Sequence, residues 1–105
     1  MTIERGQPGS VHAAGRYVGA TGALVAAPYV PYYCANGVHV GPGLVNVLLT
    51  EPISPNNMAI AITLENGDQL FGYQIIDSTH IQVHTDDTAG VPTDNDFSIV
   101  VIRTG

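Results

Sequence analysis

Five short runs rich in apolar and β-branched residues follow one another along the chain after residue 43, and turn-forming residues bound each run. Within the runs apolar and polar positions tend to alternate, which is typical of strands that bury one face. No window of eleven or more residues has the periodicity or the caps of a helix. We therefore predict an all-β fold, a small antiparallel β-sandwich of jelly-roll-like form, with strands at 44–50, 58–64, 70–76, 79–85 and 97–103.

The connections between the runs predict the order of the strands. Tight connections at 65–68 and 77–78 join the second, third and fourth runs, which favours a three-strand meander. The connections 51–57 and 86–96 are longer and contain proline, so we expect them to cross between two sheets.

The part of the chain before these runs is irregular. Residues 1–15 combine glycine, proline and small residues without periodicity, and we interpret them as an extended N-terminal arm that a partner must order. Residues 16–105 form the predicted β-sandwich domain, and the length of 105 residues suits one such domain. Two prolines within 16–40 place any strand there at an edge, and Asn36-Gly37 predicts a tight turn.

The charge balance excludes some classes of partner. The chain has no lysine and only three arginines against nine acidic residues, so its formal net charge is −6. Nucleic acids and anionic membranes bind basic surfaces, so we expect neither as a partner. No stretch has the pattern of a signal peptide or a membrane span, and we expect the chain to be soluble as made.

The stretch HIQVHTDD (80–87) contains two histidines and two aspartates, which raises the question of a metal site. The alternation predicts a strand with Ile81 and Val83 facing the core and His80 and His84 on the opposite face. Four residues of a strand span about 13 Å, too far for one ion. We therefore interpret both histidines as ordinary exterior residues and predict no metal site.

Acidic residues gather in the connection 86–96, where oxygen ligands for calcium are one possibility. Their spacing differs from the helix-flanked calcium loop, and we favour the simpler interpretation that these side chains stabilise turns. If the preceding strand continues, His84 and Asp86 share one face at about 6–7 Å.

Catalytic motifs are absent from the sequence. No serine or cysteine stands in a G-x-S-x-G elbow, and the glycine-rich stretch 37–43 has no helix after it to complete a phosphate site. We expect neither enzymatic activity nor a cofactor.

The clearest candidates for a binding surface are three tyrosines beside the single cysteine: Tyr29, Tyr32, Tyr33 and Cys34. The tyrosines can anchor a neighbouring subunit or stack on a sugar, but we favour the alternative that they cap the core. For the cysteine a buried structural thiol is favoured over an interchain disulfide. Three further aromatic side chains are expected in the core: Phe71, Tyr73 and Phe97.

Three segments carry a resemblance to a known group of proteins: AAGRYVGATGALVAA (13–27), GPGLVNVLLTEPISPNNMAIAIT (41–63) and FSIVVIR (97–103). From about residue 15 to 103 the chain resembles the small β domains of tailed-bacteriophage fibre and virion-surface proteins. In that group a glycine-led strand (here 43–50) ends at a T-x-P corner, a turn follows (52–57), and a second strand returns (58–63). Unlike the fibre members, this chain has no shaft, collagen-like tract or coiled-coil heptads, which favours a capsid decoration protein.

The resemblance implies a non-enzymatic structural protein located in the virion, either a capsid decoration (cement) protein or a fibre-type component of a tailed bacteriophage. It would bind neighbouring virion proteins through its arm and its β edges and would self-associate, with a trimer as the oligomer suggested by the family. The main alternative is a receptor-binding or carbohydrate-binding tip domain that uses the tyrosines. A small metal-dependent enzyme built on residues 80–87 is the third.

Overall fold

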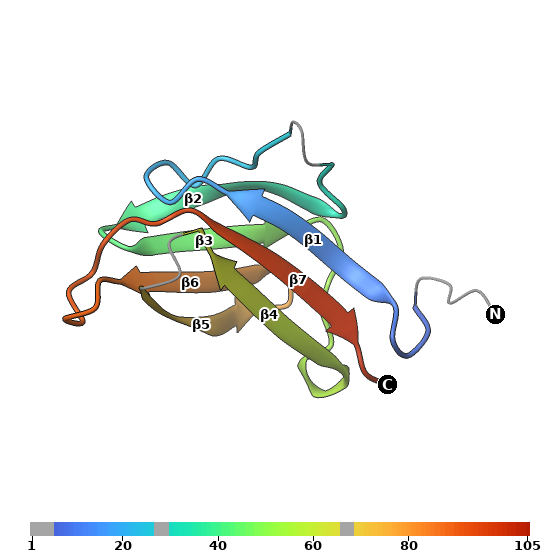
Figure 1. Ribbon diagram of the computed structural model, residues 1–105. Coiled ribbons are helices and arrows are strands. Elements are labelled where there is room, and N and C mark those ends of the chain that lie inside the picture. Colours follow the sequence, from blue (N-terminus) through green and yellow to red (C-terminus); the bar gives the residue numbers. More distant parts are fainter. Residues whose placement is uncertain (1–5, 27–29, 66–68) are drawn as a thin grey trace.

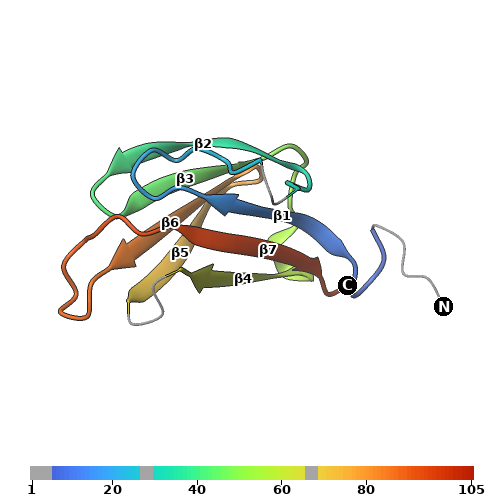
Figure 2. The same ribbon diagram turned by 45° about the horizontal axis from the view of Figure 1, so that its top comes forward.

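The computed structural model describes residues 6–26, 30–65 and 69–105, and within them the chain forms two antiparallel sheets that pack face to face (Figures 1 and 2). Sheet A has the strand order β1-β7-β4 and sheet B the order β2-β3-β6-β5. The predicted small antiparallel β-sandwich is confirmed. The elements are β1 (Val11–Tyr17), β2 (Cys34–Gly41), β3 (Leu44–Leu49), the 3-10 turn η1 (Pro55–Asn57), β4 (Met58–Leu64), β5 (Leu70–Asp77), β6 (His80–Asp86) and β7 (Phe97–Arg103).

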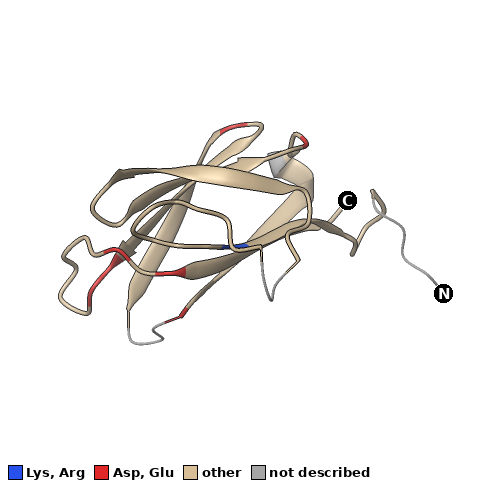
Figure 3. Ribbon diagram, turned by 90° about the horizontal axis from the view of Figure 1, so that it is seen from above, with Lys and Arg blue, Asp and Glu red and all other residues tan. Residues whose placement is uncertain are grey.

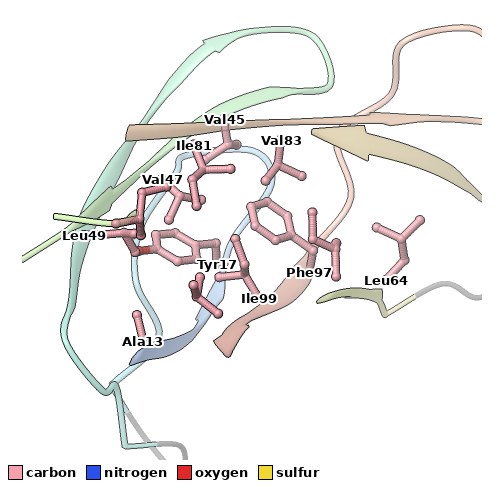
Figure 4. Close-up of a cluster of buried hydrophobic side chains, with 13 residues drawn as sticks. Ala13, Tyr17, Val45, Val47, Leu49, Leu64, Ile81, Val83, Phe97 and Ile99 are labelled. Atoms are coloured by element: carbon pink, nitrogen blue, oxygen red, sulfur yellow. The ribbon is translucent and has the colours of Figure 1, made fainter. Parts of the chain in front are cut away.

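The core lies between the sheets and follows from the two-residue alternation in the central strands (Figure 4). Antiparallel register aligns these rows, so that Val47 stands opposite Ile81 in sheet B and Ile62 opposite Ile99 in sheet A. Full burial of one such side chain stabilises a fold by about 1.5–3 kcal/mol. The rows of the three central strands are Val45, Val47 and Leu49 of β3, Ile81 and Val83 of β6, and Phe97, Ile99 and Val101 of β7.

The strand connections agree with the sequence in part. Both longer connections cross between the sheets, from β3 to β4 and from β6 to β7, and β5 and β6 form a hairpin, as predicted. The three-strand meander is wrong, because β4 pairs with β7 in sheet A and β5 belongs to sheet B. Alternation gives residues 58–64 one apolar face, and either sheet can bury that face, so the pattern does not specify the neighbouring strand.

The predicted arm must also be corrected. Residues 11–15 belong to β1, which pairs with β7 along its length, and Ala13 is buried. The chain joins the sandwich two residues earlier, since the Gly9 N–H donates to Arg103 O (2.7 Å) and the Arg103 N–H donates to Ser10 O (2.9 Å). Small residues and a bulge near the start of β1 break the alternation that would have revealed this strand. Residues 1–5 lie outside the described residues.

One flank of the sandwich, where β1 and β2 form the sheet edges, is closed by the chain that connects them. The Val25 N–H donates to Arg16 O (2.8 Å) on the β1 side, and the Gly37 N–H donates to Gly22 O (2.9 Å) on the β2 side. The predicted edge position of this region is confirmed. Asn36-Gly37 does not form a turn: it lies inside β2 at a register shift, and the chain reverses after Gly41 instead.

Tyr17 joins the sheets at this closed flank. It is fully buried, its ring stacks on Phe97 with centroids 5.6 Å apart and planes at 14°, and its hydroxyl donates to Ala35 O at 2.8 Å. Burial raises the pKa of the Tyr17 hydroxyl, so the group stays protonated as a donor. A buried phenol with a satisfied hydroxyl combines apolar packing with a specific tie between β1 and β2.

Replacing Tyr17 with phenylalanine should reduce the free energy of unfolding by about 1–2 kcal/mol, because Ala35 O loses its donor while the apolar packing is kept. Urea denaturation followed by circular dichroism measures the change. Tyr73→Phe is the matched control, since Tyr73 is 45% exposed, and should change the stability little. Equal effects of the two variants would contradict the role assigned to the Tyr17 hydroxyl.

Candidate functional site

Two of the three tyrosines singled out in the sequence, Tyr32 and Tyr33, lie at the rim of the sandwich. Tyr29 lies outside the described residues. Tyr32 and Tyr33 are 38% and 39% exposed, and their rings meet edge to face with centroids 4.7 Å apart. The expectation that they cap the core is therefore wrong for these two. The backbone of Tyr32 exchanges two hydrogen bonds of 2.8 Å with Ala14 at the edge of β1, which holds this segment outside the space between the sheets.

Cys34, next in the chain, points the other way. It begins β2, is half-buried and packs against the core, close enough to Gly15 that a Cβ there would lie 3.3 Å from its Sγ. Burial raises the pKa of the thiol, and the Tyr17 hydroxyl and the Ala14 backbone partly offset this rise. A thiol with a raised pKa is a weak nucleophile, so the tyrosines and the cysteine do not form one reactive site.

Strand β5 has an exposed apolar surface that was not predicted from the sequence. Phe71 and Tyr73 were expected in the core together with Phe97, and only Phe97 is buried; Phe71 is 48% exposed and Tyr73 is 45% exposed. Leu70 and Ile76 on the same strand are also about half exposed, at 52% and 48%. The prediction that Phe71 and Tyr73 are buried is wrong. The alternation along the strand was interpreted correctly, but the two sheets differ in their number of strands.

The register explains how this happens. Phe71 and Tyr73 pair with Thr85 and Val83 of β6, both buried, so the two aromatic residues belong to the inner face of sheet B. Sheet B has four strands and sheet A has three, and β5 is the outermost strand of the larger sheet. Three strands do not cover four, and the inner face of β5 is left partly open. The sequence did contain one indication of this exposure, because the run at 70–76 has apolar residues on both faces of the strand.

The histidine-aspartate stretch has the predicted placement on β6. Ile81 and Val83 are completely buried, whereas His84 is exposed on the opposite face. His80 Nδ1 lies 2.8 Å from Asp77 Oδ1 across the β5–β6 turn. His84 Nδ1 lies 4.0 Å from Asp86 Oδ2, since the strand continues to Asp86. Each histidine thus has its own neighbouring carboxylate.

The acidic connection after β6 ties loops together through its carboxylates, in accord with the turn-stabilising interpretation. Asp87 Oδ1 accepts hydrogen bonds from the Ala89 and Val91 N–H groups, both at 2.9 Å. Asp96 Oδ1 accepts the Gly19 N–H at 2.9 Å. These oxygens are engaged by backbone donors, and Figure 3 shows the acidic residues at the loops and strand ends rather than along the strands.

Asp94 links three parts of the chain. Its Oδ1 accepts the Gly43 N–H at 2.8 Å and lies 3.0 Å from His39 Nε2, so one carboxylate links the β6–β7 connection to β2 and to the β2–β3 turn. Gly43 has a φ of +67°, and a Cβ there would collide with Thr85 O, so the turn needs glycine. The Gly43 N–H and then the His39 side chain lower the pKa of Asp94.

In the part of the chain that the structure describes, no three His, Cys, Asp or Glu side chains gather closely enough to hold a metal ion. The same residues include no helix that is long and apolar enough to cross a membrane. Comparisons with protein-family models, curated proteins and solved structures gave no match. The surfaces of this chain are therefore the features that bear on its function.

Replacing Asp94 with alanine should lower the stability at neutral pH by about 1 kcal/mol, because the Gly43 N–H loses its acceptor. The folded-state pKa of Asp94 lies below the ordinary value of 3.8, so its ionised form stabilises the fold above that value and the contribution is lost as the pH falls through the lower folded pKa. The difference in stability between the wild type and Asp94→Ala should therefore become smaller in acid, and the wild type should approach Asp94→Asn. Thermal unfolding between neutral pH and strong acid measures both effects.

Asp94→Asn is the control, because its amide oxygen can still accept the Gly43 N–H without a charge. It should keep most of the stability at neutral pH and lose the acid dependence that Asp94 provides. A constant difference between Asp94→Ala and the wild type at every pH would contradict the assignment.

Proposed function

We propose that this chain is a non-enzymatic structural subunit that packs against other protein subunits through its sheet edges. The sequence resemblance supports a tailed-bacteriophage virion as the assembly, with the chain as a capsid decoration or fibre-type component. The main structural support is the exposed apolar strand β5, on which four large apolar side chains are about half exposed.

This observation favours an assembly role because of how sheet edges are usually protected. Proteins that stay monomeric blunt such edges with lysine, with other charges or with a covering segment. In β5 the only charged residue is Asp77, at the end of the strand. Clustered apolar residues on a surface mark contact sites, and the acidic residues outside β5 favour solubility of the free subunit.

The contacts of the polar residues also support a structural role. Asp77, His80, His39 and Asp94 are engaged in contacts that hold turns and loops. An acid-base pair for catalysis needs a substrate within hydrogen-bond reach, whereas these pairs reach from one connection to the next. They serve the rigidity of the scaffold, which is what a packing subunit requires.

The corrected N-terminus changes how such a subunit would attach. Because residues 11–15 form part of β1, they are not free to reach a neighbouring protein. The contact surfaces available in the described chain are the sheet edges and the rim around Tyr32 and Tyr33.

Particles produced from the genome that encodes this chain should contain it as a stoichiometric component. Density-gradient purification followed by quantitative mass spectrometry measures its copy number relative to the major capsid protein. The chain should stay with the particles through a salt wash that removes soluble proteins of the same lysate. Its absence from purified particles would rule out the virion role.

The alternative of a carbohydrate-binding tip has one specific observation in its favour, the exposed ring pair of Tyr32 and Tyr33. Aromatic rings with exposed faces are common platforms for sugars, although the edge-to-face geometry offers one ring face at a time. On this alternative, the protein binds defined glycans on an array and Tyr32→Ala loses at least tenfold in affinity. Tyr73→Ala should bind as the wild type does, and an array without signal excludes the alternative.

A further inference from the structure

The two flanks of the sandwich differ in how their sheet edges are covered. The edges of β1 and β2 are bridged by the chain between them, through hydrogen bonds to Arg16, Ala14 and Gly37. On the opposite flank β4 and β5 form the edges (Figures 1 and 2), and within the described residues each has a single neighbouring strand, β7 and β6 respectively. One flank of the molecule is therefore able to accept another strand.

Of these two open edges, β5 has the larger apolar surface. The exposed positions of β4 include the small residues Ala59 and Ala61. Those of β5 include Leu70, Phe71 and Tyr73, each about half exposed. A partner strand beside β5 would gain main-chain hydrogen bonds and cover aromatic rings, as in strand addition to a sheet edge.

Two copies of this chain repel each other because both are acidic, so a contact between them requires surfaces without charge. Each copy carries a net charge of −6, and Figure 3 shows the acidic residues of the described chain at the loops and strand ends. From residue 70 to residue 76 β5 has no charged residue. Two copies that approach through β5 bring neutral surfaces together and keep most of their acidic residues apart.

The sequence of β5 is also self-complementary in one antiparallel register. With Tyr73 on a two-fold axis perpendicular to sheet B, residue 71 of one strand faces residue 75 of the other, and residue 72 faces residue 74. This places Phe71 against Ile75, with Gly72 beside Gln74, so large apolar residues meet each other and the polar Gln74 meets the smallest residue. The regular part of β5 ends at Ile75, where its register against β6 shifts.

We propose that two copies of this chain associate through an antiparallel β5–β5 contact centred on Tyr73, which joins their B sheets into one continuous sheet. The proposal deepens the proposed function by naming the partner and rests on the assembly role. The axis keeps Phe71 and Tyr73 of both copies on the same side, so the aromatic residues that sheet A leaves open cover one another. Cross-strand aromatic and β-branched pairs of this kind stabilise antiparallel ladders.

The contact is small. A single pair of strands with two half-exposed aromatic residues from each copy falls at the lower end of specific interfaces, below about 1,200 Å² in total. We therefore expect a dimer that dissociates on dilution, and one that high salt strengthens, since salt screens the repulsion between two copies of charge −6.

Sedimentation velocity and equilibrium of the full chain, at micromolar to millimolar concentration and at low and high salt, test the contact. The wild type should approach twice its mass of 11.0 kDa as the concentration rises. Tyr73→Lys should sediment as a monomer, because it places two like charges on the axis. Val38→Lys is the matched control, since Val38 is 63% exposed on β2, and should dimerise as the wild type does.

A second pair of variants tests the register without adding charge. In a Cys34→Ser background, Tyr73→Cys should form a disulfide-linked dimer under mild oxidation. Residues opposite each other in antiparallel strands have Cα atoms about 4.5–5.5 Å apart, within the range that a disulfide spans. Gln74→Cys should cross-link much more slowly, because the register places it opposite Gly72 rather than opposite itself.

A dimer that is lost in Tyr73→Lys and captured by Tyr73→Cys supports the proposal. A wild type that stays monomeric under all conditions, a trimer such as the family resemblance implied, or a dimer unaffected by Tyr73→Lys overturns it. Circular dichroism shows whether Tyr73→Lys is folded, and if it is not, the cross-linking pair decides the outcome. These results leave the virion role untouched, because that role is judged by the content of purified particles.

Discussion

A three-stranded sheet packed against a four-stranded sheet leaves part of the larger sheet uncovered, and most features of this protein's surface follow from that mismatch. The interior is filled where the central strands β3, β6 and β7 meet. Beyond them, β5 keeps the inward alternation of a buried strand without an opposite sheet to bury it, so Phe71 and Tyr73 stay half exposed. The same strand ends its sheet, so open backbone and apolar side chains occur together.

The ends of the strands are stabilised differently from their middles. Arg16 is the only charged residue inside a described strand, since Asp77, Asp86 and Arg103 stand at strand ends. Acidic side chains act as hydrogen-bond acceptors for backbone N–H groups in the connections, as Asp94 does for Gly43 and Asp96 does for Gly19. These acidic side chains thus accept hydrogen bonds from backbone N–H groups that have no partner in a sheet. The uncharged strand surfaces that result are those best suited to contact another protein.

How much of this could be predicted from the sequence depends on the range of the interaction. Alternation and turn residues are local features of the sequence. They predicted the five strands after residue 43 and the outward orientation of His80 and His84. Lateral order is not local: β4 pairs with β7, more than thirty residues away. β1 escaped detection because its small residues and its bulge weaken the alternation. The exposure of Phe71 depends on the number of strands in the opposite sheet, which no single strand encodes.

The asymmetry between the two flanks connects the fold with the proposed assembly role. The residues between β1 and β2 close one flank by hydrogen bonds to both edges, so the fold has the means to cover an edge. On the other flank the described chain supplies no such segment to β5, although β5 has the greater apolar exposure. An uncovered edge that is also apolar exposes a monomer to uncontrolled association, a cost that natural sequences usually avoid with lysine or proline. In β5 neither residue is present, which is consistent with an edge that a partner covers in the assembled state.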